Sequence, residues 1–493
     1  MNIKKGLAYV FLATGIGFVI NLATNFLLPK FLSVETYADI KLYQLYITYI
    51  GILHLGFSDG MYLRLGGKKL KDIDTKELLS EFKTFKIFQL VINIIALVYA
   101  VLMKNIILIS VAVSIIPVNA INYLRNLYQA TGLYDLYSKF TTTNNMMLFI
   151  INILLLFVAK SDNPNVYIVG NVIVYFLNWL LIEFVIRKKV FYNQKAKTNI
   201  RYLFSDIKSG ILLMLGNFCS VIFTSIDRMF VKYVLGTVQF AYYSFAVSVE
   251  GLLNTFITPV VVTMYNYLCN NNIPEKILKI KRLLLIVVSL LLASAFPVKW
   301  VINTFITRYQ MASNIIFVLF TAQFFTIIVK CIHTNLYKAE KKQSKYFKII
   351  IIISILAVIF DWLACIINKS NEGFAVATLI VSILWFVIGE MEFKNSMFKV
   401  KDYSFMIIIL SVYLVTGLGI VNAIIGCIIY IILTVINIKI FLEEELNWLL
   451  KEIEKYIKKY YKFPENFFKK LLHKKNTSVI IKKNLTKERK KPK

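Results

Sequence analysis

The sequence predicts an all-α, polytopic membrane protein with about fourteen transmembrane helices. Of its 493 residues, 58% are hydrophobic and 17% are charged, whereas soluble domains average roughly 45–50% apolar and 25% charged residues. Apolar runs of about 20 residues recur from residue 7 to residue 441, and each is long enough to cross a hydrocarbon core of about 30 Å. The first run, 7–29, is too long for a signal-peptide core and lacks a cleavage site, so we expect it to be retained.

The distribution of basic residues supports this helix count. The predicted crossings are 7–29, 42–65, 84–103, 106–130, 140–159, 165–186, 209–235, 239–268, 282–303, 310–337, 346–367, 373–392, 404–419 and 420–441. With a cytoplasmic N-terminus, the inner loops carry 28 of the 57 Lys and Arg residues, the outer connections carry eight and the segment after residue 443 carries 16. A wrong count would exchange inner and outer loops partway along the chain and break this positive-inside bias. We therefore expect both termini in the cytoplasm.

The net charge of +30 follows from topology and from contact with anionic lipid rather than from nucleic-acid binding. No separate basic domain with a nucleic-acid motif is present. The segment 443–460 is typical of a basic amphipathic helix that lies at the surface of an anionic leaflet. Its apolar residues recur at helical spacing with lysines between them: Leu446, Leu449, Leu450, Ile453, Ile457 and Tyr460. The final stretch "KKNLTKERKKPK" has too little apolar content to pack and is expected to be disordered.

Chemical motifs are sparse, which argues against an enzyme. Five cysteines and three histidines are scattered singly, without metal-ligand or Cys-x-x-Cys spacing. No loop offers a nucleophile–base pair or a phosphate-cradling glycine motif, and the short outer connections leave no room for an external domain. We expect no metal site and no cofactor.

A short internal repeat predicts two halves of like orientation. Leu32, Ser33, Tyr37 and Ala38 match Leu235, Gly236, Phe240 and Ala241 in type and spacing. Because six helices separate the two copies, the halves share one orientation and are related by an axis along the membrane normal. We expect a six-helix N-lobe at 1–200, a six-helix C-lobe at 201–400, two extra helices at 401–442 and a cytoplasmic basic tail at 443–493.

At these residues the chain resembles the polysaccharide-biosynthesis branch of the MOP (MATE-like) exporter superfamily, including Wzx-type flippases. The resemblance rests on residues 18–68, 216–268 and 336–382, among them "KFLSVETYADIK", "TSIDRMFVKYVLG" and "NEGFAVATLIVS". It implies two lobes in a V around a central cavity, alternating access, and a polyprenyl-diphosphate-linked oligosaccharide as cargo in a bacterial cell membrane. O-antigen and capsule repeat units are the expected class, and other polysaccharide assembly proteins are expected partners. Fourteen crossings depart from many Wzx-type members and are closer to lipid II flippases, where the two extra helices border a groove for the lipid tail.

Four cations within or at the ends of crossings are the candidate substrate ligands: Arg64, Arg125, Arg228 and Lys330. A charge at bilayer depth faces a cavity or a partner, and a guanidinium fork suits a diphosphate. Arg64 has an alternative interpretation as a topology anchor that reaches the cytoplasmic surface. Arg125 lies in "INYLRNLYQA", whose polar stripe of Asn122, Asn126 and Gln129 favours a cavity or a helix interface over lipid.

Acids in the crossings are candidates for a gate or for ion coupling. Asp227 and Arg228 are neighbours on one helix and point about 100° apart, so each needs its own partner. Asp227 either bridges to a basic residue and locks an outer gate or lines the cavity, whereas Arg228 either faces diphosphate or reaches the outer surface. Glu250 and Asp361 are the candidates for coupling to Na⁺ or H⁺. Two further acids, Asp59 and Glu183, are expected to neutralise arginines or to serve the same purpose.

The expected function is therefore a flippase that turns a lipid-linked oligosaccharide from the cytoplasmic to the outer leaflet. Two alternatives remain open at this point. One is a flippase of lipid II or of a teichoic-type precursor, which differs in cargo alone. The other is a multidrug or cation antiporter of the same superfamily, whose cavity should be acidic or apolar.

Overall fold

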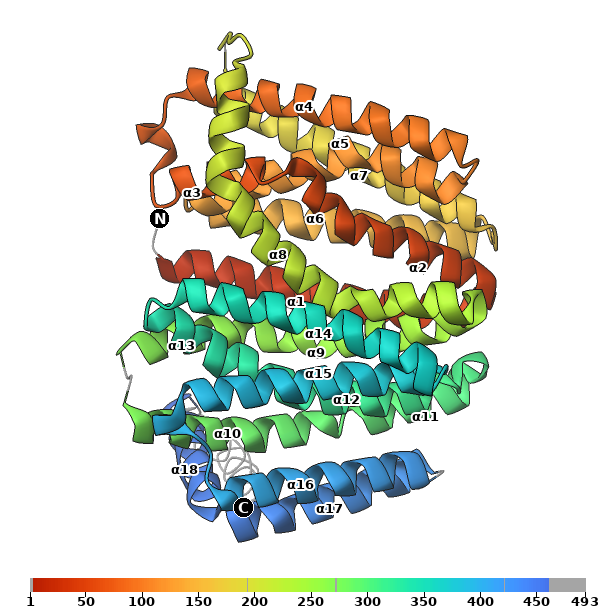
Figure 1. Cartoon of the computed structure of the whole chain (residues 1–493), viewed down its shortest axis with the longest axis vertical. Helices are drawn as coiled ribbons and strands as arrows, with labels where there is room; N and C mark the ends of the chain where they lie inside the picture. The colour runs from red at the N-terminus through yellow and green to blue at the C-terminus, as the bar shows by residue number, and fades with distance from the viewer. Residues whose placement is uncertain (1–2, 193, 271–272, 421, 461–493) are drawn as a thin grey trace, which may run out of the picture.

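The computed structural model describes residues 3–192, 194–270, 273–420 and 422–460. Within them, twelve helices are long and apolar enough to cross a membrane, so this is a multi-pass membrane protein with an almost entirely helical fold. Two more segments lie alongside these helices (Figure 1): α1, and the pair α2 and α3. They correspond to the first two predicted crossings, and the count of fourteen stays a prediction.

The helices of the predicted N-lobe pack around α5. They are α1 (Ile3–Phe31), α2 (Val34–Tyr49), α3 (Phe57–Leu65), α4 (Thr75–Leu102), α5 (Ile106–Ala130), α6 (Tyr134–Ile153) and α7 (Pro164–Lys189). Helix α5 contacts α2, α3, α4, α6 and α7. A stack of aromatic rings fills the space between α3, α4 and α5, where the ring of Tyr123 lies 4.9 Å from Phe85 and 5.3 Å from Phe82.

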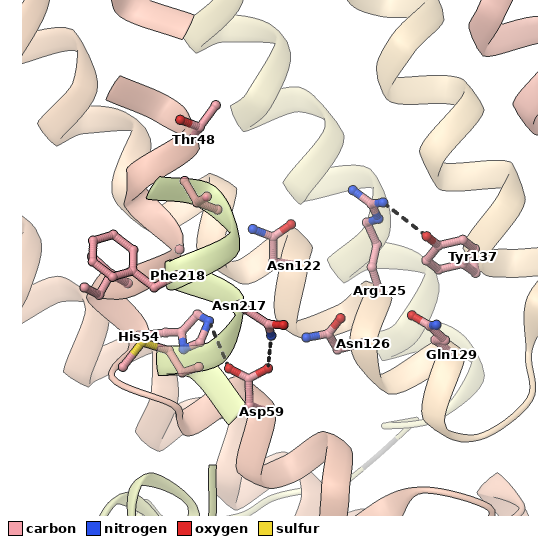
Figure 2. A pocket seen from close by; sticks show the side chains of 14 residues that line it. Thr48, His54, Asp59, Asn122, Arg125, Asn126, Gln129, Tyr137, Asn217 and Phe218 are labelled. Atoms are coloured by element: carbon pink, nitrogen blue, oxygen red, sulfur yellow. Dashed lines mark hydrogen bonds and ion pairs between the residues drawn. The ribbon is translucent and has the colours of Figure 1, made fainter. Parts of the chain in front are cut away.

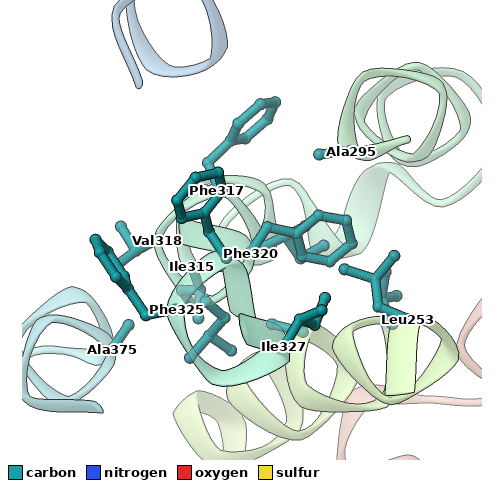
Figure 3. Close-up of a cluster of buried hydrophobic side chains, with 14 of the residues drawn as sticks. Leu253, Ala295, Ile315, Phe317, Val318, Phe320, Phe325, Ile327 and Ala375 are labelled. Carbon is teal, nitrogen blue, oxygen red and sulfur yellow. The ribbon is translucent and has the colours of Figure 1, made fainter. Parts of the chain in front are cut away.

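The helices of the predicted C-lobe pack around α12. They are α8 (Ile200–Leu235), α9 (Thr237–Asn270), α10 (Pro274–Leu292), α11 (Ala295–Phe305), α12 (Ala312–Ile328), α13 (Thr334–Ala339), α14 (Gln343–Ile367) and α15 (Asn371–Glu392). The most apolar stretch within 312–339 is 94% buried. Figure 3 shows why: residues of α12 such as Phe317, Phe320 and Phe325 point in different directions toward α9, α11 and α15. A helix that is apolar on all sides belongs at the centre of a bundle.

The two halves meet along α8. This helix runs obliquely across Figure 1 from near the start of α4 to the start of α9, and it contacts α3 and α4 of the first half and α14 and α15 of the second. The internal repeat marks equivalent junctions: Leu32 and Ser33 join α1 to α2, and Leu235 and Gly236 join α8 to α9. The lobe boundaries at 200 and 400 stay predictions.

The second predicted crossing, 42–65, is not one continuous helix. Helix α2 begins earlier, at Val34, and ends at Tyr49, and a 3-10 turn at Ile50–His54 leads into α3. Leu55 and Gly56 adopt left-handed φ angles of 49° and 86°, which stop the helix and re-aim the chain. Apolar periodicity gave no sign of this break, because apolar residues continue on both sides of it.

The last three helices lie at the edge of the C-lobe: α16 (Val400–Leu414), α17 (Ala423–Phe441) and α18 (Glu443–Tyr460). The predicted helix after residue 443 is present, and it packs against α10 and α17. Its Leu446 and Leu449 touch the hydrophobic core, whereas Leu450 and Ile453 are exposed. The predicted disordered end falls in 461–493, outside the described residues.

Candidate functional site: two polar cavities along α8

Four residues of α8 form a stripe that passes two cavities. Asn217, Val221, Thr224 and Arg228 are spaced by four, three and four residues, and therefore share one face of the helix. The first two line a cavity of about 220 Å³ that we call the N-cavity. The last two line a cavity of about 210 Å³ that we call the C-cavity. Both cavities therefore lie on a helix that joins the two halves.

The N-cavity holds Arg125 (Figure 2). Its guanidinium lies 5.3 Å from the ring centroid of Tyr137, and its Nη2 is 3.5 Å from the tyrosine hydroxyl. The Nε of Arg125 is buried without a hydrogen-bond partner. The predicted polar stripe of α5 lines the same cavity, with Asn122, Asn126 and Gln129 beside the arginine.

Asp59 of α3 is the acid of the N-cavity. Its Oδ1 accepts a hydrogen bond from Asn217 at 3.4 Å, and its Oδ2 lies 3.7 Å from Nε2 of His54. Asn217 belongs to α8, so this contact joins the two halves of the molecule (Figure 2). Asp59 forms no ion pair with Arg125 within the part of the chain that the structure describes.

The C-cavity brings together four of the seven predicted site residues: Asp227, Arg228, Glu250 and Lys330. They come from α8, α9 and the π-helical turn Val329–His333 that follows α12. A π turn inserts one residue into the helix and changes the direction of the side chains within it. The Nζ of Lys330 donates to the amide oxygen of Asn254 at 2.8 Å, and Glu250 accepts a hydrogen bond from Gln323.

Asp227 has three hydrogen-bond donors, and none of them is the side chain of Arg228. Asp227 accepts hydrogen bonds from the Tyr243 hydroxyl at 2.8 Å, from the Thr378 hydroxyl at 3.4 Å and from the Arg228 backbone N–H at 2.7 Å. No ion pair of Asp227 occurs among the described residues, so the predicted bridge to a basic residue is absent from this conformation. Arg228 lines the cavity, and its Nε is buried without a partner.

Asp361 lies in α14, outside the lining of the C-cavity. Its side chain is buried, and it interacts electrostatically with Asp227 and Tyr243. Asp361 has no hydrogen-bond donor among the residues that the structure describes. The carboxylates of Asp227 and Asp361 therefore interact where α8 packs on α14. Asp227 accepts three hydrogen bonds, whereas Asp361 accepts none from the described residues.

Arg64 lies apart from both cavities and is already paired. It forms an ion pair with Glu81 of α4 and a second with Asp206 of α8, whose Oδ1 lies 3.3 Å from the arginine Nε. Tyr123 donates to the other oxygen of Glu81 at 2.8 Å. Arg64 therefore ties α3 to α4 and α8. Glu183, the acid predicted together with Asp59, pairs with Lys86 at 2.7 Å and with Arg187 at 2.6 Å.

Sequence reasoning missed several polar residues of these sites, namely Glu81, Tyr123, Asp206, Asn217, Asn254, Gln323 and Thr378. One signal was available for Asn217 and Asn254. Each is an amide in an apolar run on the same helical face as a predicted charge, and such amides form interhelical contacts.

Comparison with known proteins shows which solved structures share this fold. No family model matches the chain, and no curated protein matches it. Among solved structures, the chain resembles the lipid II flippase MurJ in an inward closed conformation, with a TM-score of 0.69 and 17% identity, covering 89% of this chain and 99% of that one. It also resembles a multidrug resistance MATE family transporter of the MOP superfamily in an inward-facing conformation, with a TM-score of 0.57 and 13% identity, covering 78% of this chain and 94% of that one.

At these identities the likeness establishes the fold alone. The predicted MOP-like fold is confirmed. Both similar structures are transporters and not enzymes. The Wzx-type branch, the cargo and the roles of the site residues are matters of proposal.

Proposed function

We propose that this protein is a flippase that moves a polyprenyl-diphosphate-linked oligosaccharide from the cytoplasmic to the outer leaflet of a bacterial cell membrane by alternating access. The observation that carries the proposal is the state of the hydrogen-bonding groups in the two cavities. The carboxylates there accept hydrogen bonds from the protein's own neutral donors, whereas Arg125 and Arg228 each keep a buried Nε that has no partner among the described residues. A phosphate group would supply acceptors for these two arginines.

The charge count alone does not decide between an anionic and a cationic cargo. In the C-cavity, Arg228 and Lys330 face Asp227 and Glu250, which is formally neutral. Three donors already satisfy Asp227, and an amide satisfies Glu250. Lys330 has a neutral partner in Asn254. Neither cation forms an ion pair with these acids among the described residues, so the two cations favour an anion in the cavity.

The alternative cargoes remain distinct proposals. Similarity to MurJ, a lipid II flippase, supports a lipid-linked substrate without specifying its sugar, so a lipid II or teichoic-type precursor is one alternative. A multidrug or cation antiporter is the other. The three acids Asp227, Glu250 and Asp361 favour it, since they also suit a coupling cation, Na⁺ or H⁺.

The same proposal covers the membrane topology, the lipid contacts and the partners of the protein. Both termini are proposed to lie in the cytoplasm, on the side of the lysine-rich loops. Helix α18 turns the exposed Leu450 and Ile453 outward and would rest on anionic lipid. Other polysaccharide assembly proteins are proposed partners, and no nucleic acid is expected.

The experiment is flipping of a fluorescent prenyl-diphosphate oligosaccharide in proteoliposomes, followed with a membrane-impermeant quencher. The double variant Arg228→Ala/Lys330→Ala should flip at least tenfold more slowly, because charged hydrogen bonds contribute about 1.5–3 kcal/mol each. The matched control Arg201→Ala/Lys188→Ala removes one arginine and one lysine that are exposed and should flip normally. Normal flipping by the cavity variant at equal reconstitution would remove the proposal, and uptake of a cationic dye by the wild type would favour the antiporter.

A further inference from the structure

A third cavity opens at the end of the molecule where α3 and α5 end and α6 begins. It has a volume of about 650 Å³, larger than either cavity along α8. Its cations are three exposed lysines of the loop between α3 and α4: Lys68, Lys69 and Lys71. We call it the lysine cavity. None of these lysines forms an ion pair within the residues that the structure describes.

The acids nearest in sequence are used elsewhere. Asp74 caps α4, where its Oδ1 accepts from the backbone N–H groups of Lys76 and Glu77 at 2.8 and 3.3 Å. Neither Asp72 nor Asp74 lines the lysine cavity. The cavity therefore has three cations and no carboxylate in its lining.

The C-lobe contains a turn that can be compared with the one beside the lysine cavity. The sequence Leu-Tyr-x-Ala ends α5 at residues 127–130 and recurs at 336–339, where α13 ends. Both copies are followed by the same turn: Leu133 N–H donates to Tyr128 O, and Lys342 N–H donates to Tyr337 O, each at 2.8 Å. The residue before the donor has a positive φ in both, 73° at Gly132 and 57° at Lys341. The two loops are equivalent positions of the repeat.

A cavity of about 480 Å³ also lies beside the second copy, and two glutamates stand in its lining beside three lysines. Lys342 pairs with Glu340 at 2.8 Å and with Glu392 at 3.6 Å, and Lys345 pairs with Glu392 at 2.5 Å. The second cavity thus holds two lysines paired with glutamates, whereas the three lysines of the first cavity have no acidic partner among the described residues. Cations gathered without counter-charges form an anion site.

The lining of the lysine cavity also fits an amphiphile. Leu63 is 53% exposed and Tyr134 is 38% exposed, and both line the cavity together with the lysines. Gln129 lines this cavity and the N-cavity alike. An anion held by the lysines would therefore be one side chain away from the cavity that contains Arg125.

We propose that the lysine cavity binds a phosphate-bearing anion, and that it is where the diphosphate of a prenyl-linked substrate docks before it enters the N-cavity. This proposal rests on the proposed function. Lysine ammonium groups bind phosphate as point charges, and the exposed Leu63 would contact the first part of the prenyl chain. Gln129, which lines both cavities, would lie on the path of the diphosphate into the N-cavity. A soluble phosphate compound offers the same chemistry as the lipid head group.

The test measures binding of two probes to the full chain in phosphatidylcholine nanodiscs: a prenyl diphosphate in the bilayer and inorganic pyrophosphate in solution. The variant Lys68→Gln/Lys69→Gln/Lys71→Gln should bind the prenyl diphosphate roughly ten- to a hundredfold more weakly, because each lysine near the surface contributes about a factor of five. Its binding should also depend less on salt concentration. The control Lys188→Gln/Lys189→Gln/Lys195→Gln removes three exposed lysines, two at the end of α7 and one in the α7–α8 connection, and should bind like the wild type.

The two probes separate the sources of the anion. Tighter binding of the prenyl diphosphate than of pyrophosphate, lost in the lysine variant, supports docking of the lipid. Equal binding of both probes, lost in the same variant, supports the anion site but overturns the docking of a lipid. Wild-type binding by the lysine variant overturns the site itself. If flipping still depends on Arg228 and Lys330 in that case, the proposed function stands without it.

Discussion

Gly60 of α3 and Gly210 of α8 lie backbone against backbone. A Cβ atom on either glycine would collide with main-chain atoms of the other helix segment. Small residues let membrane helices approach this closely, and here the contact joins the first half of the chain to the second. Four residues from each glycine, Arg64 and Asp206 form their ion pair. The close approach and the ion pair together hold α3 and α8 in this conformation.

The variant Gly210→Ala should therefore force α3 and α8 apart. Over-packing of a tight contact costs about 1–3 kcal/mol, and the nearest neighbours of a new Cβ are backbone atoms that cannot rotate away. We expect a lower midpoint of thermal unfolding in detergent. The control is Gly15→Ala, because nothing lies within 4 Å of a Cβ at Gly15 and alanine favours a helix. Equal midpoints for the two variants would mean that the contact is looser than the structure indicates.

The ion pairs of Arg64 predict unequal effects of two neutralising substitutions. Arg64→Gln leaves the buried Glu81 and Asp206 without a cation and should cost about 2 kcal/mol, less than the 3–5 kcal/mol of a fully buried pair, because the Arg64 side chain is 34% exposed. Asp206→Asn leaves Arg64 and Glu81 as a single pair and should be nearly neutral. Chemical or thermal unfolding of the two variants checks this order. A larger loss for Asp206→Asn would contradict it.

The sequence predicts helices and buried charges better than it predicts their partners. Apolar runs predict crossings because bilayer thickness sets their length, and the repeat at Leu32 and Leu235 coincides with the α1–α2 and α8–α9 junctions. The partners of Arg64 lie 17 and 142 residues away, so only tertiary packing identifies them. The break at Leu55 and Gly56 was missed because a buried 3-10 turn keeps the apolar pattern of a helix.

The dependence of transport on a Na⁺ or pH gradient should require Asp361 and not Glu183. Asp361 is buried near Asp227 without a hydrogen-bond donor, and a bound Na⁺ or H⁺ would relieve the repulsion between the two carboxylates. Asp361→Asn should therefore flatten the dependence of transport on a Na⁺ or pH gradient. Glu183→Gln should keep that dependence, because Glu183 already pairs with Lys86 and Arg187. Gradient-driven transport by both variants, measured in proteoliposomes, distinguishes the two acids.

Helix α18 should be held to the C-lobe by Arg282. This arginine donates to Asp402 at 2.9 and 3.1 Å and to Glu445 of α18 at 3.3 Å. Glu445→Gln keeps the two-pronged pair with Asp402 and weakens only the link to α18, so we expect faster hydrogen exchange in 443–455 with a change in global stability of about 1 kcal/mol or less.

Arg282→Gln should act differently, because it leaves the fully buried Asp402 without a cation. A loss of about 3–5 kcal/mol in unfolding free energy is expected for a buried pair broken in this way. The exposed Glu444 on the same helix provides the matched control, and Glu444→Gln should change neither measurement. Exchange in 443–455 that is equally slow in Glu445→Gln and Glu444→Gln would mean that Leu446 and Leu449, through their contact with the core, hold α18 without the ion pair.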